Sequence, residues 1–238
     1  KLDGNYPTGT NNVALGNTAL DSGSLSGGCN TAIGNASLTA NTSGTQNIGI
    51  GHLALTANTE GIRNIAIGAN SADANTTGGC NVAVGQSSLG TNTSGCCNVA
   101  IGGSALGNST TASNNTAVGK SALETNSTGA NNTAVGLCSL YNNTTCSSNT
   151  AVGYISMCGN GTISGDLNTA LGNAALRCIT SGSENTSLGY ISGLSNSTGS
   201  NNTFVGASSG QNNTTGSNNV AVGRQSFDAN TTGQKNTA

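Results

Sequence analysis

The sequence predicts an all-β protein, a parallel β-solenoid (β-roll) built from coils of about 17 residues. A five-residue motif, Asn-(Thr/Val/Ile)-Ala-(Val/Ile/Leu)-Gly, recurs along the whole chain, with three exceptions at its central alanine. Eleven of the thirteen intervals between the motif asparagines are 17 residues long, and the other two are 18 and 19. Such a period is typical of repeat architectures, and helical repeats are longer, at ~33 residues or more. The β-branched residues and regular glycines favour short strands between turns.

The positions of each repeat are numbered as columns 1 to 17, starting at the motif asparagine. Columns 2 to 4 are predicted to form a strand, and the rest of the coil a second short strand and two turns. The invariant glycine of column 5 indicates a positive φ or a close backbone approach. The column 1 asparagines are expected to stack into a ladder of side-chain hydrogen bonds. Its central members are Asn30, Asn47, Asn64, Asn81, Asn98, Asn115, Asn132 and Asn149.

The alternation of side chains along a strand places columns 2 and 4 on one face and column 3 on the other. We expect the aliphatic residues of column 4 and the leucines of column 9 to fill the interior. Column 3 would then point outward, although it is alanine in ten of thirteen repeats. A small apolar row beside a strand suggests close approach by another surface, and so lateral association of chains, with three around an axis. The alternative is that alanine is simply tolerated outside.

The repeats span residues 1–238 as a single array of about 13 coils. Leu2 and residues 5–9 resemble columns 9 and 12 to 15 of an earlier repeat, and residues 236–238 match columns 1 to 3 of a further one. Solenoids normally carry a polar capping unit at each end, and none is visible here. We therefore expect a window of a longer array.

Composition disfavours enzymes and several kinds of partner. Charged residues are only 6% of the chain, and six Lys and Arg face eight Asp and Glu, so no basic stripe for nucleic acid exists. No stretch approaches the ~18 apolar residues of a membrane span. The single histidine, His52, and the scattered carboxylates Asp21, Asp73, Glu124 and Asp228 form no catalytic constellation. No Cys-x-x-Cys pair is present for zinc. We expect a protein without catalytic residues, cofactor or metal.

Two copies of the motif, residues 98–102 and 115–119, show a family resemblance. They resemble the head repeats of trimeric autotransporter adhesins, and the 17-residue form is similar to repeats in tail-fibre proteins of phages and large viruses. The resemblance implies a left-handed parallel β-roll, assembled as an intertwined trimer in a surface-exposed stalk or head. The chain departs from the adhesin heads in its longer repeat and in its eight cysteines.

Two pairs of cysteines fall in successive coils. Cys80 and Cys97 both occupy column 17, which places their Cα atoms about 4.8 Å apart, within the range that a disulfide spans. Cys158 and Cys178 occupy columns 10 and 11 of a later pair of coils, with an insertion between them. Disulfides would fit an oxidising, extracellular setting, whereas reduced thiols would fit a particle assembled inside a cell.

The chain contains 17 Asn-x-Ser/Thr sequons. Nine of them start at column 12, in a predicted outer turn, and would offer a row of N-glycosylation sites in a eukaryotic secreted protein. The alternative is that Asn and Thr serve turn chemistry and side-chain ladders there. The nine asparagines are Asn41, Asn75, Asn92, Asn126, Asn143, Asn160, Asn196, Asn213 and Asn230.

These features together predict a structural, non-enzymatic fibre or stalk, extracellular or on a cell or virion surface, that associates laterally as a homotrimer. Two alternatives remain, namely a self-assembling filament with or without N-glycans, and an adhesive fibre that binds a cell-surface carbohydrate or receptor. Ice binding is disfavoured, because the threonines of columns 13 and 14 are adjacent and would point opposite ways. Aliphatic residues also interrupt the column 2 threonines, at Ile48, Ile65, Val82 and Val99.

Overall fold

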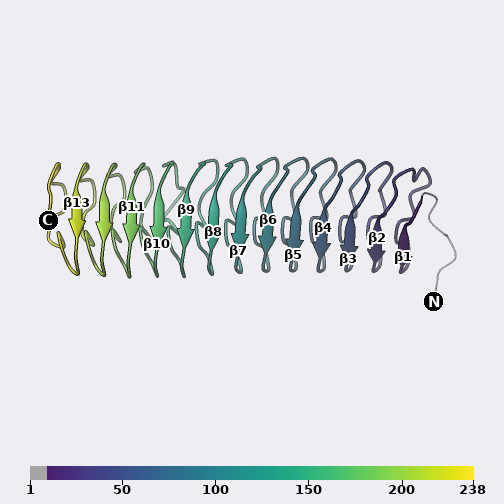
Figure 1. Cartoon of the computed structure of the whole chain (residues 1–238), viewed down its shortest axis with the longest axis horizontal. Helices are drawn as coiled ribbons and strands as arrows, with labels where there is room; N and C mark the ends of the chain where they lie inside the picture. The colour runs from purple at the N-terminus through teal and green to yellow at the C-terminus, as the bar shows by residue number, and fades with distance from the viewer. Residues whose placement is uncertain (1–9) are drawn as a thin grey trace. The chain divides into compact units, whose positions relative to one another are not determined.

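The computed structural model describes residues 10–238 and has the predicted fold class, an all-β parallel β-solenoid (Figure 1). The predicted remnant of an earlier repeat, at residues 2–9, lies outside the described residues. The chain divides into two compact units, which meet in sequence between Ala117 and Val118. Each coil contributes one strand of three residues, formed by columns 2 to 4.

In the first unit, consecutive strands lie side by side and pair in parallel (Figure 1). Strand partners such as Thr31 and Ile48 are one repeat apart, so equivalent columns stack in register. The longer first repeat is accommodated without a register shift, because Val13 still pairs with Thr31. The strands are β1 (Val13–Leu15), β2 (Thr31–Ile33), β3 (Ile48–Ile50), β4 (Ile65–Ile67), β5 (Val82–Val84) and β6 (Val99–Ile101), and β7 (Thr116–Val118) contains the boundary.

The second unit repeats this arrangement. Its strands pair in parallel and in register, and the 19-residue repeat still brings Thr150 opposite Thr169. The last residues begin a further coil, since Thr237 forms a parallel bridge with Val220. The strands are β8 (Thr133–Val135), β9 (Thr150–Val152), β10 (Thr169–Leu171), β11 (Thr186–Leu188), β12 (Thr203–Val205) and β13 (Val220–Val222).

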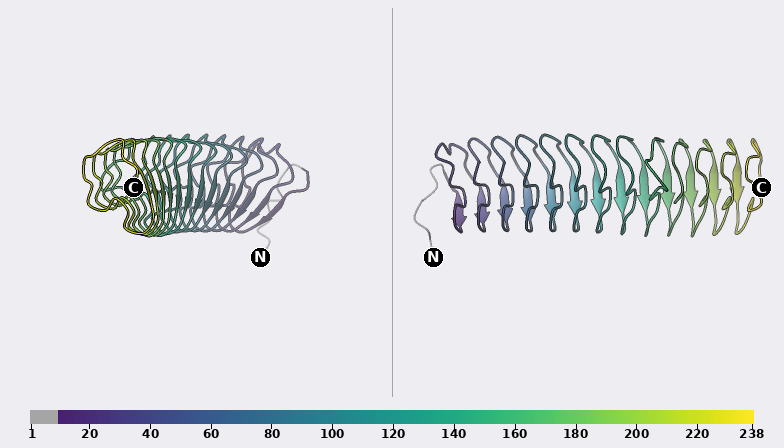
Figure 2. Two further views of the ribbon diagram at one scale, coloured as in Figure 1. Left: turned by 60° about the vertical axis from the view of Figure 1, so that its left-hand side comes forward. Right: turned by 180° about the vertical axis from the view of Figure 1, so that it is seen from behind.

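The prediction of a second strand in each coil is wrong. Columns 7, 9 and 17 adopt left-handed backbone conformations, as at Ala36 (φ 55°), Leu38 (φ 53°) and Gln46 (φ 60°), and this bends the chain where an extended strand was expected. The curved segments are nevertheless bonded from coil to coil. The Leu38 amide donates to the Ala54 carbonyl at 3.0 Å, for example. Within each unit the coils therefore stack on all sides, as the oblique view in Figure 2 shows.

Column 5 glycine has the role that the sequence predicts. Gly34 has φ of +132°, and a Cβ there would lie 2.4 Å from the carbonyl oxygen of Gly51 in the next coil. Only glycine permits both this conformation and this approach.

The predicted orientation of the strands is inverted in the structure. Column 3 alanines such as Ala32, Ala66 and Ala134 are completely buried, whereas the aliphatic side chains of columns 2 and 4 point outward. The leucines of column 9, predicted to be internal, are indeed buried. Their bulk explains the inversion in the coils that carry them. They lie opposite the strand and leave little interior volume for the side chain of column 3. A Cβ at column 3 residue Gly49 would lie 2.5 Å from Oγ of Ser37 and 3.3 Å from Cγ of Leu38, so this position admits only small side chains.

Candidate functional site

The outward side chains of columns 2 and 4 form a surface that we call the outer strand face. In the first unit, all eight such residues of β3 to β6 are isoleucine or valine, and Ile67 and Ile101 are 38% and 39% exposed. No charged residue occupies either column. The face is therefore a regular apolar array: Ile48, Ile50, Ile65, Ile67, Val82, Val84, Val99 and Ile101.

The outer strand face of the second unit has a different composition. The first residue of each strand from β8 to β12 is threonine, and the last is valine or leucine. Because these strands pair in register, a row of hydroxyl groups runs beside a row of aliphatic side chains. The threonines are Thr133, Thr150, Thr169, Thr186 and Thr203. The alanines of column 3, predicted to meet another chain, are buried, and columns 2 and 4 form the outward face instead.

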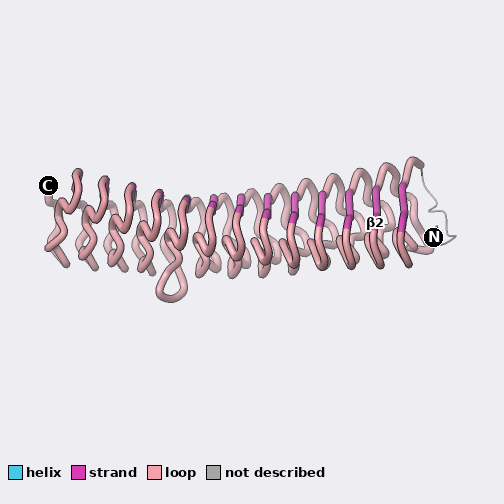
Figure 3. The backbone as a smooth tube through the Cα atoms, turned by 90° about the horizontal axis from the view of Figure 1, so that it is seen from below, coloured by secondary structure: helices cyan, strands magenta, loops and turns pink. Residues whose placement is uncertain are grey.

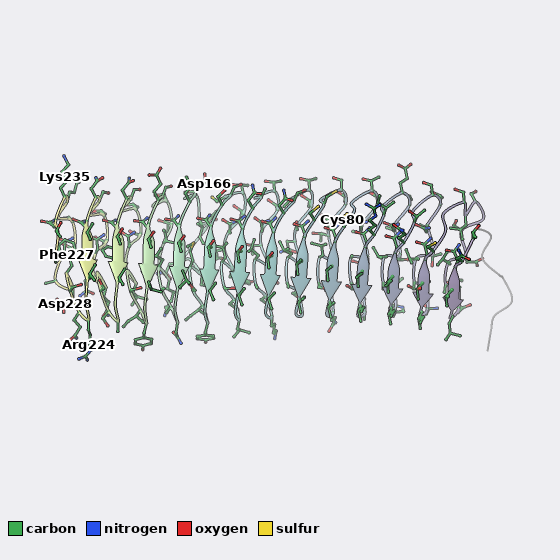
Figure 4. The ribbon with its side chains drawn as sticks, viewed as in Figure 1. Cys80, Asp166, Arg224, Phe227, Asp228 and Lys235 are labelled. Carbon is green, nitrogen blue, oxygen red and sulfur yellow. The ribbon has the colours of Figure 1, made fainter. Side chains whose placement is uncertain are left out.

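Charged side chains and tyrosines lie on the other outer positions of the coil. Arg224, Asp228 and Lys235 point away from it (Figure 4). Column 6 of the second unit carries two exposed tyrosines, Tyr154 and Tyr190, which are 51% and 59% exposed. They stand two coils apart in the same column and offer rings to the solvent. Tyr141 is only half-buried and belongs to another column.

The column 1 asparagines form a continuous chain of hydrogen bonds within each unit. Oδ1 of Asn64 accepts the backbone N–H of Asn81 at 3.0 Å, and Nδ2 of Asn64 donates to the Gly78 carbonyl at 2.8 Å. Each asparagine thus bonds the next coil through Oδ1 and the column 15 carbonyl of its own coil through Nδ2. Equivalent bonds recur along the ladder, and its central members are almost completely buried.

A second ladder occupies column 12, where the sequence suggested exposed glycan acceptors. Asn58 Nδ2 donates to Asn41 Oδ1 at 2.8 Å and to the Gly61 carbonyl at 3.1 Å. This placement corrects the predicted outer turn, because Nδ2, the atom that would carry a glycan, is inside the coil. The sequon asparagines buried in this way are Asn41, Asn75, Asn92, Asn126, Asn143, Asn196 and Asn213, and Asn230 is half-buried in the last coil.

The column 12 ladder has breaks, and they leave buried acceptors unsatisfied. Ser109 replaces asparagine after Asn92, and Ile163 replaces it after Asn143, with which Ile163 pairs in a parallel bridge. Oδ1 of both asparagines and Oγ of Ser109 have no hydrogen-bond partner among residues 10–238. A complete ladder would have supplied Nδ2 of the next asparagine to each Oδ1.

Asn160 is the exception among the nine predicted acceptors. The 19-residue repeat inserts a loop after β9 that extends beyond the loops of neighbouring coils (Figure 3). Ile163 takes the interior position of column 12, so Asn160 is exposed on this loop. A count of columns from the sequence could not reveal this, because it does not show where an insertion is absorbed.

Cys80 and Cys97 are neighbours, as their shared column predicts. Both are exposed, and Cys80 lies on the outer turn of its coil (Figure 4). Desolvation raises the pKa of the Cys97 thiol, and the adjacent Cys80 raises it further. Cys96 makes separate contacts, with its Sγ accepting the Gly79 N–H at 3.3 Å. All eight thiols of the chain are free in the structure, and the disulfide stays a prediction.

The second predicted pair belongs to a larger group of thiols. Burial raises the pKa of the Cys158 thiol, Cys138 raises it further, and the Arg177 guanidinium lowers it. Cys178 has a smaller effect than Cys138 on Cys158. The group therefore offers Cys158 two thiol neighbours, of which the sequence singled out only Cys178.

Among residues 10–238, no three His, Cys, Asp or Glu side chains come together in a way that could hold a metal ion. The same part of the chain contains no helix with the length and apolar character needed to cross a membrane. No protein family, curated protein sequence or solved structure matches the chain. The fold alone therefore defines its class, a β-solenoid repeat protein with coils of about 17 residues.

One signal in the sequence could have revealed the true orientation of the strands. The only large residue in column 3 is Phe204, and column 9 is glycine only at Gly193 and Gly210, in the same region of the chain. Such a compensation of volume between two columns is expected only if both face the same interior.

Proposed function

We propose that this chain is part of a structural, non-enzymatic fibre or stalk, extracellular or on a cell or virion surface, whose coils associate laterally with further copies through the outer strand face. The main support is the regular, uncharged apolar array of β3 to β6 in the first unit. Burial of apolar surface in a contact between chains is favourable by about 25 cal/mol for each Å² removed from water. A strand that is apolar on both sides is normally covered on both sides.

The repeat makes such an association additive. Every coil presents the same two outward positions, so each added coil extends the contact by one equivalent step. The motif's resemblance to trimeric autotransporter heads and viral tail fibres favours three copies around an axis and a left-handed coil. A self-assembling filament would use the same face with a different symmetry.

Adhesion is a second candidate function, favoured by one observation. Tyr154 and Tyr190 expose their rings in one column, and tyrosine offers an apolar ring with a polar tip, which suits a carbohydrate or a receptor surface. Glycan-array binding of the full chain tests this candidate. Signal that is lost in Tyr154→Ala and Tyr190→Ala, but kept in the exposed-residue control Leu137→Ala, would support it.

Sedimentation equilibrium of the full chain, without and with a reducing agent, tests the principal proposal. A homotrimer has three times the 23.0 kDa mass of the chain, and a filament has an open-ended distribution. A concentration-independent monomer would contradict lateral association.

A further inference from the structure

We propose that Asn160 is a site of spontaneous covalent modification, at which the side-chain amide is converted through a cyclic imide into aspartate and isoaspartate. Residues 160 and 161 form an unusual dipeptide. Asn160-Gly161 is the single Asn-Gly step in a chain with 37 asparagines. Glycine has no Cβ to shield its amide nitrogen and allows the backbone to reach conformations closed to other residues.

The reaction needs only these two residues and water. The Gly161 backbone nitrogen loses its proton and attacks Cγ of Asn160, forming a new C–N bond. The tetrahedral intermediate collapses by breaking the bond from Cγ to Nδ2, and ammonia leaves. Water then opens the five-membered imide at either carbonyl, which yields aspartate or isoaspartate. No electrons are transferred, and the net change is the replacement of ammonia by water.

The loop leaves both reacting groups free. Asn160, Gly161 and Thr162 are all exposed, and a Cβ at Gly161 would meet nothing within 4 Å. Neither the Asn160 side chain nor the Gly161 amide makes a hydrogen bond to any group within the described stretch 10–238. The nucleophile and the electrophile can therefore approach each other without breaking a bond of the fold.

Ladder asparagines such as Asn30 and Asn75 are held in place by hydrogen bonds, as are the amides that follow them. After the column 1 residue Asn30, the amide of Thr31 donates to the Asn47 carbonyl at 2.8 Å. After the column 12 residue Asn75, the amide of Thr76 donates to the Thr93 carbonyl at 2.9 Å. Attack by these nitrogens would first break a bond between coils, and the asparagine side chains are fixed as well.

Two exposed asparagines outside the ladders show the same protection. Asn35 is exposed, but the amide of the following Ala36 donates to the Asn17 carbonyl at 2.9 Å. Asn212 is exposed too, and the amide of Asn213 donates to the Gly210 carbonyl at 3.1 Å. Exposure alone therefore does not distinguish Asn160 from Asn35 and Asn212, whereas the free amide of Gly161 does.

The modification would place a carboxylate on an outer loop and leave both ladders intact. It would also add a backbone atom to the loop in the isoaspartate product. Because Ile163 supplies the interior side chain of this coil, the stacking would not depend on residue 160. The same change would remove the acceptor of the Asn160-Gly161-Thr162 sequon.

The test uses the full chain produced in a bacterial host without N-glycosylation and incubated at mildly alkaline pH. Tryptic cleavage after Lys120 and Arg177 gives a peptide of residues 121–177 that contains Asn160, and fragmentation mass spectrometry locates the conversion within it. We expect aspartate and isoaspartate to accumulate at Asn160 several-fold faster than at Asn35. Gly161→Ala should slow the conversion several-fold, while Thr162→Ala, which removes the sequon and keeps the Asn-Gly step, should leave its rate unchanged.

Equal conversion at Asn160 and Asn35, or an unchanged rate in Gly161→Ala, would overturn the proposal. Urea provides a further check, since unfolding should release the ladder asparagines and spread conversion along the chain. Conversion that is equally widespread in the folded protein would contradict the protection by the ladders.

Discussion

The Phe204 ring occupies the space that a leucine side chain would need at Gly210. A Cβ built on Gly210 would lie 2.3 Å from Cδ1 of this ring, and one on Gly193 would lie 2.8 Å from Cδ2. In most other coils the partners are reversed in size, with alanine at column 3 and leucine at column 9, both buried. Interiors are closely packed, so the two columns share one fixed volume.

This relationship predicts a reciprocal rescue. Phe204→Ala should lower the free energy of unfolding by about 3–5 kcal/mol, because it leaves a cavity. Gly210→Leu should also destabilise the fold through the clash with the ring. The double variant restores the usual pair, and leucine tolerates the backbone conformation, as Leu106 has φ of 50°. Urea denaturation should show the double variant to be more stable than either single variant. Additive losses would contradict a shared volume.

The column 1 ladder predicts a large cost for removing one member. Asn64→Ala would leave the buried N–H of Asn81 without its acceptor, which costs about 1–3 kcal/mol. Thermal and urea unfolding measure the loss. The matched control is the adjacent Arg63→Ala, where an exposed side chain is truncated and the change should stay within about 0.5 kcal/mol. Equal stability of the two variants would show that the ladder bonds contribute nothing.

The break at Ser109 predicts a stabilising change. Asparagine at this position would offer Nδ2 to the unsatisfied Oδ1 of Asn92. Ala112→Gly is added because a Cβ at the equivalent Gly44 would lie 2.3 Å from the ladder oxygen of Asn41. We expect Ser109→Asn with Ala112→Gly to be about 1 kcal/mol more stable than Ala112→Gly alone. A lower melting temperature than that control would contradict this account of the break.

The contact between Cys80 and Cys97 predicts a disulfide under oxidising conditions. Oxidised glutathione should accept the two electrons and convert the pair into a bond between adjacent coils, which raises the stability by up to about 3 kcal/mol. Peptide mapping without reduction identifies the link. Cys97→Ser should abolish it, and Cys29→Ser, at an exposed thiol in the same column, should leave it unchanged. A dominant link from Cys96 instead would show that the shared column does not decide the pairing.

The period of the sequence was sufficient to predict the coil, because each repeat places one strand in register with the next. It also predicted the stacking of Asn64 under Asn81, since residues in one column must be neighbours in a solenoid. The pattern of apolar residues could not predict the direction in which the strand faces. Ile101 is more hydrophobic than Ala100, but Ala100 is buried, because Leu106 on the opposite side of the coil leaves a thin interior. Here the available volume, and not hydrophobicity, determines which face of the strand is inside.

The same limit applied to the candidate sites. Asn75 and Asn160 both begin sequons, and the sequence assigns both to column 12. In the structure Asn75 is a buried ladder member, whereas Asn160 lies on an exposed loop. The difference depends on where the inserted residues are placed in the coil. The hydrophobic side chain of Ile163 takes the interior position of column 12, so Asn160 lies in the added loop.

The most direct test of the proposed lateral association is the mass of the full chain in solution, compared between two doubly substituted variants. Ile67→Lys with Ile101→Lys puts charge on the outer strand face, whereas Thr77→Lys with Thr111→Lys adds the same charge on an exposed turn of the same unit. We predict by light scattering that the wild type and the turn variant are multimeric and that the face variant is a 23.0 kDa monomer with unchanged circular dichroism. A face variant that assembles like the wild type would contradict association through this face.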